Sequence, residues 1–341
     1  MTILTSAYLL RLGICVLPAL AFLGVLMLLD SFKLAPMRRV FVSLGAGGAV
    51  AWIAFEISEL WLGSGGVPHN TWLNAPLAEE LLKAFVLVWL IRSGRIGFLV
   101  EGAIYGFAIG AGFATIENIV YLHYLGNTGL FLWLVRGLGT AMMHGGGTAI
   151  VGILAASQAH RSGVRQALAL AAGWAVGSGI HILYNSPLLS PSVAAAMVLA
   201  GVPVLMGAIF TTSERAVEHW LGAGFDADME LLSQIASGEF GQTPAGLYLR
   251  SMRASFAPQV VADMFCVLQV CTELAIRAKA EVLKREAGFE APRNPEIEER
   301  LVELRFLEKH IGATGRLAIA PLLGARSRRL WELRQMGYSA V

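Results

Sequence analysis

The sequence predicts an all-α membrane protein: a polytopic bundle of about seven membrane-spanning helices, followed by a C-terminal soluble helical domain. Of its 341 residues, 56% are hydrophobic and only 15% are charged, which is far from the composition of a soluble domain. Apolar runs of membrane-spanning length recur through the first two thirds of the chain. Charge is also divided unevenly, because residues 1–211 hold 10 of the 26 Lys and Arg and 7 of the 24 Asp and Glu.

The membrane-spanning segments are predicted from runs of about 20 apolar residues, the length that crosses the hydrocarbon core as a helix. The first run lacks a basic segment before it and is longer than the apolar part of a usual signal peptide, so we expect it to be retained. The predicted spans are 8–29, 40–62, 76–92, 97–122, 130–157, 166–186 and 192–211. We therefore expect a transmembrane core over residues 1–211 and a cytoplasmic helical tail domain over residues 212–341.

Basic residues occur only in alternate connections between the predicted spans. Because cytoplasmic loops are enriched in Lys and Arg, this alternation predicts an N-terminus outside and a cytoplasmic tail, with the chain in the cell (inner) membrane. The basic residues that follow the first, third, fifth and seventh spans are Lys33, Arg38, Arg39, Arg92, Arg95, Arg161, Arg165 and Arg215.

The C-terminal third reads as helical. Asn294 and Pro295 form a helix start, and apolar residues then recur on one face, at Ile297, Leu301, Leu304, Leu307 and Ile311. A hinge between membrane part and tail is expected within residues 223–244, which contain three glycines. Nothing in the tail suggests chemistry, and the tail could bind a cytoplasmic partner.

Composition excludes two classes of function. The net charge is +2 and no basic face is concentrated enough for nucleic acid, so we expect no nucleic-acid partner. Three cysteines are too few and too badly spaced for a disulfide framework or a thiolate metal site.

Ionisable side chains within the predicted spans are the main functional signal. Such a residue costs about 2.5 kcal/mol or more to insert, so it usually faces the bundle interior and marks a site. We expect Arg136 to be an interfacial residue whose long side chain reaches the membrane surface. The other polar residues of the spans, in chain order, are Glu79, Glu80, Lys83, Glu117, Asn118, His144, His181 and Asn185.

These residues are predicted to lie near one depth. With a rise of 1.5 Å per residue, Glu79 and Glu80 fall within about 10 Å of the outer boundary, and Glu117 and His181 fall at a similar level. His144 comes out deeper by this count unless residues 129–139 run partly along the interface.

Two stripes of small residues favour close packing of the helices that carry these groups. One stripe is Gly102, Gly106, Gly110 and Ala114, with Asn118 continuing it, and the other is Gly173 and Gly177 followed by His181 and Asn185. The polar groups would then be held on tightly packed helices.

The residue types fit amide hydrolysis. Two adjacent carboxylates near Lys83 can divide their roles, one ion-paired and one available as a base. Two histidines and Asn185 can polarise water and stabilise an oxyanion, either directly or through a metal. A zinc ion held by His144, His181 and Glu117 would leave a fourth position for water. Zinc is slightly favoured over a metal-free mechanism that uses glutamate.

The ordered motifs resemble the PrsW family of intramembrane proteases, which belongs to a wider group with the CAAX prenyl endopeptidases. The motifs are Glu79-Glu80-Leu-Leu-Lys83, Phe113-Ala-Thr-Ile-Glu117-Asn118, His144 with Gly152 eight positions on, and His181-Ile-Leu-Tyr-Asn185. The resemblance covers roughly residues 70–210. It implies hydrolysis of a membrane-protein substrate near the outer face, such as an anti-sigma-type single-span regulator. The final motif of the family often has Trp-Asp where this chain has Tyr184-Asn185, and the long tail is an addition.

Structural explanations stand beside these functional ones. The paired acids could favour a helix N-terminus, Glu117 could form an ion pair with Arg136 or Lys83, and both histidines could be packing groups. A transporter or proton-coupled channel would also place acids and histidines within the membrane, but would predict inverted repeats and a polar path at several depths. A membrane anchor that presents the tail to a partner is the third alternative, and it leaves the ordered motifs unexplained.

Overall fold

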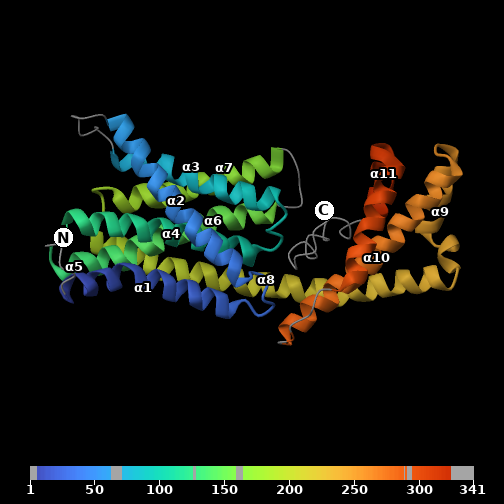
Figure 1. The fold of residues 1–341 in the computed structure, drawn as a ribbon, viewed down its shortest axis with the longest axis horizontal. Coiled ribbons are helices and arrows are strands. Elements are labelled where there is room, and N and C mark those ends of the chain that lie inside the picture. The colour runs from blue at the N-terminus through green and yellow to red at the C-terminus, as the bar shows by residue number, and fades with distance from the viewer. Residues whose placement is uncertain are drawn as a thin grey trace. The chain divides into compact units, whose positions relative to one another are not determined.

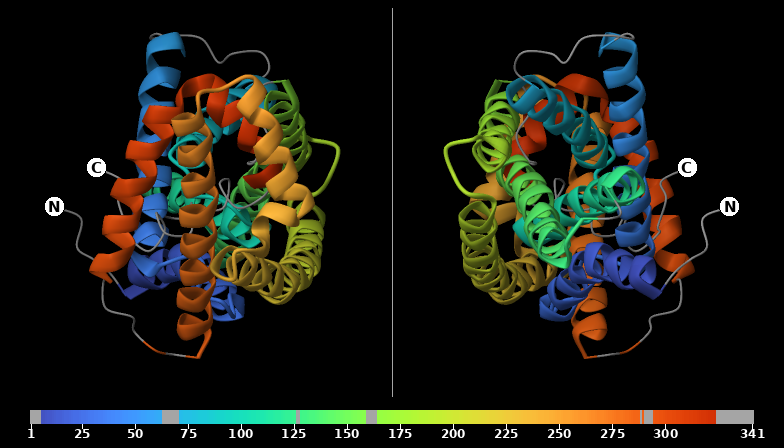
Figure 2. Two further views of the ribbon diagram at one scale, coloured as in Figure 1. Left: turned by 90° about the vertical axis from the view of Figure 1, so that its right-hand side faces the viewer. Right: turned by 90° about the vertical axis from the view of Figure 1, so that its left-hand side faces the viewer.

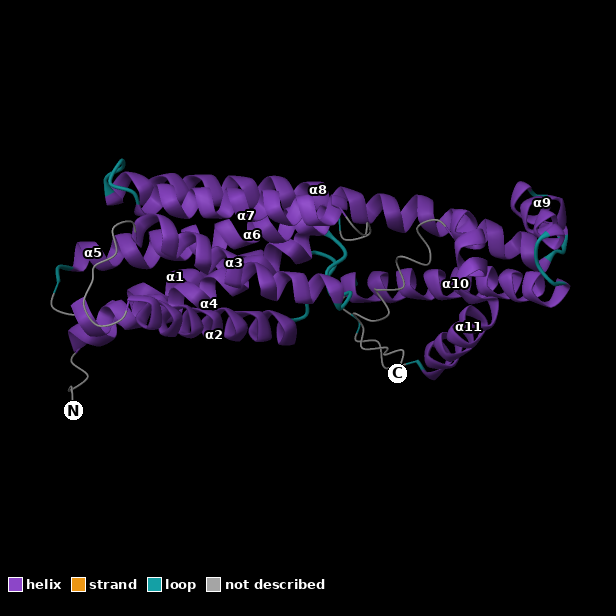
Figure 3. Cartoon of the chain, turned by 90° about the horizontal axis from the view of Figure 1, so that it is seen from above, coloured by secondary structure: helices purple, strands orange, loops and turns teal. Residues whose placement is uncertain are grey.

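The computed structural model describes residues 6–62, 71–125, 128–158, 164–287, 289 and 294–323. Within these ranges all regular structure is helical (Figure 3). The chain forms two compact units, Met1–Ser213 and Glu214–Val341 (Figure 1).

The first unit consists of long helices that run roughly along one direction and are seen nearly end-on in Figure 2. One of them is a single continuous helix made of α5, a π-helical turn η1 and α6. The last, α8, continues past residue 213 into the second unit. The helices are α1 (Ser6–Leu29), α2 (Met37–Leu62), α3 (Thr71–Arg92), α4 (Leu99–Leu125), α5 (Leu130–Leu134), η1 (Val135–Thr140), α6 (Ala141–Ser157), α7 (Val164–Asn185) and α8 (Pro191–Ala236).

The prediction of an all-α polytopic membrane bundle is confirmed. Among the described residues, seven helices are long and apolar enough to cross a membrane. Six of these match predicted spans, and the seventh is α10 (Pro258–Glu286) of the second unit. Helix α3, the predicted third span, is not among the seven. Every 18-residue stretch of α3 contains Glu79, Glu80 and Lys83, so α3 carries more charge than a typical membrane span. Glu80 and Lys83 are nevertheless buried within the unit, so these charges do not face lipid and α3 remains compatible with the membrane.

Helices α4 and α6 form the centre of the first unit. Helix α4 and the continuous α5 to α6 helix each have 83% of the residues of their most apolar stretch buried within the protein. The corresponding share in α1 and in α7 is 22%. The sequence explains this, because the central helices are rich in glycine and alanine, whose small side chains let neighbouring backbones approach closely. The outer helices present larger apolar side chains to the lipid.

The second unit is built on the pairing of two helices with one shared apolar core. Its elements after α8 are η2 (Glu239–Gln242), α9 (Pro244–Ser251), η3 (Met252–Ala254), α10 and α11 (Pro295–Leu323). The predicted helix start is confirmed, since the Asn294 side-chain oxygen accepts a hydrogen bond of 3.0 Å from the backbone N–H of Glu296. The five apolar residues expected on one face are all buried in the core.

The first break in the chain path after α8 begins lies within the stretch 223–244 where a hinge was expected. Helix α8 runs through Gly224 to Ala236 without a break. The chain turns only afterwards, at Gly238, whose φ of 80° lies in the left-handed region that glycine adopts at little cost. The assignment of catalysis to residues 1–211 and of a cytoplasmic role to residues 212–341 stays a prediction.

Candidate active site

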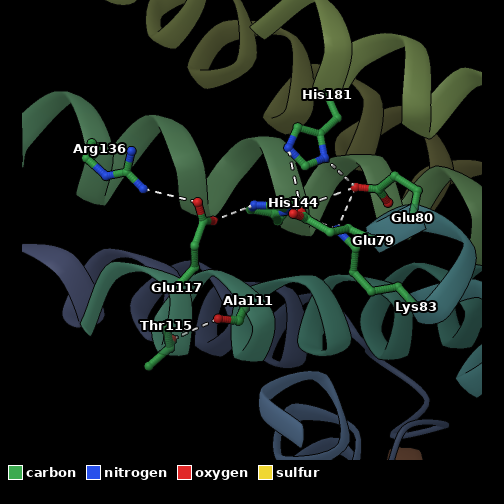
Figure 4. Close-up of polar contacts among 9 residues, drawn as sticks. All are labelled: Glu79, Glu80, Lys83, Ala111, Thr115, Glu117, Arg136, His144 and His181. Atoms are coloured by element: carbon green, nitrogen blue, oxygen red, sulfur yellow. Dashed lines mark hydrogen bonds and ion pairs between the residues drawn. The ribbon is translucent and has the colours of Figure 1, made fainter. Parts of the chain in front are cut away.

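Polar side chains from four helices meet inside the first unit (Figure 4). Helix α3 contributes the two adjacent glutamates and Lys83, α4 contributes Glu117, α6 contributes His144 and α7 contributes His181. Each is linked to at least one of the others by a hydrogen bond or an ion pair. We call this group of six residues the polar cluster: Glu79, Glu80, Lys83, Glu117, His144 and His181.

The small-residue stripes bring the helix backbones of the polar cluster together. A methyl group at Gly110 of α4 would collide with the backbone carbonyl of His144, so only glycine allows α4 to pass this close to α6. On the other side of α6, a methyl group at Gly177 of α7 would lie 3.2 Å from the carbonyl oxygen of Gly147. Glycine at these positions therefore fixes where the two histidines project.

A buried ion pair forms the base of the polar cluster. Lys83 Nζ lies 2.5 Å from Glu80 Oε1, one helical turn away, and the two side chains are 0% and 1% exposed. The ammonium also lies 4.5 Å from the centroid of the Phe113 ring. A buried charge needs such a partner, because an unpaired one would lose its hydration without compensation.

His144 bridges the ion pair to the carboxylate on α4. Its Nδ1 lies 2.7 Å from Lys83 Nζ and its Nε2 lies 2.8 Å from Glu117 Oε2. Since a lysine ammonium only donates hydrogen bonds, Nδ1 accepts and the proton of the neutral ring sits on Nε2, which donates to Glu117. Phe113 packs against the same ring, with 4.8 Å between centroids. The orientation of His144 is therefore fixed from three sides.

His181 is oriented by the same glutamate that binds the lysine. Its Nδ1 lies 3.0 Å from Glu80 Oε1, so Nδ1–H donates to this carboxylate and Nε2 carries a free lone pair. Nε2 faces Glu79 Oε2 at 3.9 Å. The side chain of Glu79 is 22% exposed, against 1% for Glu80. The adjacent acids thus differ: Glu80 is enclosed and paired, and Glu79 is the open one.

Arg136 contacts the polar cluster, whereas from the sequence it was expected to be an interfacial residue; its depth in the membrane stays a prediction. Its Nη2 donates to Glu117 Oε1 over 3.1 Å, and its guanidinium carbon lies 3.8 Å from the centroid of the Tyr121 ring. The ion pair that we considered as an explanation for Glu117 is therefore present, together with the contact to His144. A charged residue within an apolar span was the sequence signal that could have identified it.

Two predicted residues lie apart from the polar cluster. Asn185, one turn beyond His181, is exposed, and no hydrogen bond between described residues joins it to the cluster. Asn118 is fully buried, but both atoms of its amide group lack a hydrogen-bond partner within the described part of the chain. Asn118 is thus next to Glu117 in sequence without sharing its contacts.

Comparisons with known proteins agree with this geometry. A family model described as "PrsW family intramembrane metalloprotease" matches residues 35–211, just over half of the chain and the segment that contains the whole polar cluster. The chain belongs to the PrsW family. Comparisons with curated proteins and with solved structures gave no match.

A PrsW-family metalloprotease implies a metal, and the donor atoms of the polar cluster fit one. One carboxylate oxygen of Glu79 and one ring nitrogen each of His144 and His181 lie within 4.8 Å of one another. Two imidazoles and a carboxylate are a common donor set for catalytic zinc. Nε2 of His181 is free to coordinate, while its Nδ1–H is held by Glu80, the arrangement typical of metal-bound histidine. His144 would exchange one of its two present contacts for the metal.

This group of donor atoms differs from the ligand set expected from the sequence. From the sequence, Glu117 was expected as the carboxylate ligand. In this PrsW-family structure, a carboxylate oxygen of Glu79 lies close to ring nitrogens of both histidines. Glu117 instead accepts hydrogen bonds from Arg136 and His144. The depth count put His144 deeper than His181 unless residues 129–139 ran along the interface, and in the structure the two rings lie side by side, 4.5 Å between centroids. His144 lies 14 residues into a helix that starts at Leu130, while His181 lies four residues from the end of α7, so the helices do not begin at one level.

Proposed function

We propose that this protein is an intramembrane endopeptidase that hydrolyses a peptide bond of a membrane-protein substrate. The observation that carries the proposal is the polar cluster, in which three carboxylates and two histidines from four membrane helices form one connected network in a PrsW-family chain. Buried ionisable residues at this density are rare unless they do chemistry. The substrate, the cleavage position and the catalytic type go beyond the family assignment.

Glu79 is the best candidate to accept a proton. Of the three carboxylates it is the one that forms no ion pair with lysine or arginine among the described residues, and it faces Nε2 of His181. Its carboxylate takes a proton from water as the water oxygen bonds to the scissile carbonyl carbon. The same proton then passes to the amide nitrogen as the carbon–nitrogen bond breaks.

The remaining residues hold this arrangement in place. Glu80 fixes the ring of His181 through Nδ1, and Lys83 balances the charge of Glu80. Glu117 fixes His144 in the same way from the other side. For Asn185, exposed one turn beyond His181, the proposed role is to donate a hydrogen bond to the developing oxyanion of a substrate bound at this end of α7.

A zinc ion, when bound by His144, His181 and one glutamate, would supply a Lewis acid that polarises the scissile carbonyl. The structure favours Glu79 as the third ligand, whereas the sequence favoured Glu117. If Glu79 is the ligand, the proton acceptor becomes Glu117.

Bound zinc in a matched pair of variants distinguishes the two ligand sets. Glu79→Gln should lower the zinc content of the purified protein if Glu79 is the ligand, and Glu117→Gln should lower it if Glu117 is. In either case chelation should abolish cleavage and zinc should restore it. A chelator-insensitive enzyme that binds no zinc would instead support the metal-free glutamate mechanism.

The substrate is proposed to be a single-span membrane protein, of the anti-sigma type, cleaved near the outer face. An apolar cavity of about 280 Å³ lies where α6, α7 and α8 meet, and its lining includes Ile180 and Tyr184, close to His181 in sequence. It offers an apolar surface for part of such a substrate.

Cleavage and orientation are tested in separate experiments. Purified full-length protein in liposomes should cleave a single-span reporter substrate, and mass spectrometry should place the cut near one membrane face. A transporter would leave the reporter intact. Reporter enzymes fused after Arg39, Arg95, Arg165 and Val341 should report cytoplasm, and fusions at Gly65 and Asn127 the outside; an outside tail would overturn the proposed orientation.

A further inference from the structure

The π-helical turn Val135–Thr140 is the one departure from α-helical geometry within the continuous helix Leu130–Ser157. The residues on both sides of it, Leu134 and Ala141, have α-helical backbone angles, so the turn is an insertion in an otherwise regular helix. Such single turns are rare and are frequently found at functional sites.

The turn changes the register between Arg136 and His144. A π-helical turn takes up about 4.4 residues and an α-helical turn 3.6, so one of each covers about eight residues. Eight residues separate Arg136 from His144. In an uninterrupted α-helix the same separation would leave the two side chains about 80° apart around the axis. The π turn therefore brings them onto one face, two turns apart.

The two aligned side chains hold opposite oxygens of one carboxylate. Arg136 Nη2 donates to Glu117 Oε1 over 3.1 Å and His144 Nε2 donates to Glu117 Oε2 over 2.8 Å (Figure 4). Tyr121, one turn from Glu117 on α4, packs against the guanidinium with 3.8 Å to its ring centroid. A planar guanidinium with a carboxylate on one side and an aromatic face on the other has little freedom to move.

Glycine within the turn allows this geometry. A methyl group at Gly137 would collide with the backbone carbonyl of Ile14 on α1, and one at Gly139 would collide with the hydroxyl of Tyr184 on α7. The turn is thus packed between neighbouring helices on two sides, and both glycines are buried.

We propose that Arg136, placed by this π-helical turn, is a positioning residue of the active site. It fixes the Glu117 carboxylate, and Glu117 in turn fixes the ring orientation and tautomer of His144. Arg136 itself need not touch the substrate. The inference rests on the proposed protease function for its catalytic consequence, but the contact to Glu117 exists independently of it.

Replacement of Arg136 should reduce turnover rather than substrate binding. Arg136→Met should lower kcat by about 10² with little change in KM, because a small displacement of a catalytic group has an effect of this size. Arg136→Lys, which keeps the charge but loses the planar fork, should restore part of the rate. The matched control is Arg165→Met, an exposed arginine at the start of α7, which should leave kcat unchanged.

A double-mutant cycle tests whether Arg136 acts through Glu117. Arg136→Met should lower kcat in the wild type, but cause no further loss in a Glu117→Gln background. If the fold-decreases in kcat of the two single variants multiply in the double variant, the two residues act independently. That result would overturn the proposal.

The same cycle measured by thermal unfolding separates this inference from the proposed function. Arg136→Met should lower Tm in the wild type and have a clearly smaller effect in the Glu117→Gln background. If the wild type proves to have no protease activity, the proposed function fails, while coupled Tm values would still establish the contact. Equal decreases in Tm in both backgrounds would overturn the positioning role.

Discussion

Two buried acid–lysine pairs, one in each unit, show how similar contacts serve different ends. Lys83 and Glu80 in the first unit are 2.5 Å apart, and Lys279 and Asp228 in the second are 2.6 Å apart. All four side chains are at most 4% exposed. By distance and burial alone the pairs cannot be told apart.

Their surroundings differ. Glu80 Oε1 also accepts from His181, and Lys83 also donates to His144, so this pair is part of a network that continues to Glu117. Lys279 instead lies 5.4 Å from the ring centroid of Trp220. A buried ion pair is thus a weak sign of function until it connects to further groups that can transfer protons.

The largest expected difference between the two pairs is in catalysis. Glu80→Gln should lower the cleavage rate by about 10² or more, because it removes the negative charge that orients His181 and pairs with Lys83. Asp228→Asn, the matched change in the second unit, should leave the rate per folded molecule unchanged. Initial rates on a reporter substrate in liposomes, normalised to folded protein, measure both.

Either of two results would contradict this difference between the two ion pairs. A folded Glu80→Gln variant with the normal rate would show that Glu80 is structural, like Asp228. Conversely, a rate that falls as far with Asp228→Asn would show that the second unit takes part in catalysis.

Stability should respond similarly at both places. Removing one member of a buried pair leaves an uncompensated charge and destabilises by about 3–5 kcal/mol, whereas replacing both members by apolar residues is often neutral. Lys279→Met should therefore lower Tm, and Asp228→Leu with Lys279→Met should restore it. Glu80→Leu with Lys83→Met should restore stability in the same way but leave the protein inactive. Recovery of activity in this second double variant would contradict the proposed role of the network.

The sequence predicted the bundle and all six residues of the polar cluster for one reason: charges are rare in membrane helices, and those present usually face inward. The same reasoning gave Arg136 no functional role beyond a possible ion pair with Glu117, because a long basic side chain near a span end can also reach the membrane surface. The π-helical turn that redirects it depends on contacts of Gly137 and Gly139 with α1 and α7, which no local pattern specifies. For the same reason the sequence could not choose between Glu79 and Glu117 as the carboxylate closest to both histidines.

The smallest effect on the cleavage rate is expected from removal of most of the second unit. Removal of residues 226–341 deletes Asp228 and Lys279 but none of the polar cluster, since all of it precedes residue 188. The truncated chain should insert in the membrane and retain activity within a few fold of the full-length protein. Complete loss of activity in a well-folded truncation would place part of the site in the second unit.

The most direct test of the central claim is the cleavage rate of a variant without the catalytic groups. Glu79, Glu80, Glu117, His144 and His181 would all be replaced, and helix content and monodispersity in detergent would verify the fold. The account predicts that full-length wild-type protein in liposomes cleaves a single-span reporter and that this variant gives no cleavage above background. A folded variant that cleaves the reporter at the wild-type rate would contradict the assignment of peptide-bond hydrolysis to the polar cluster.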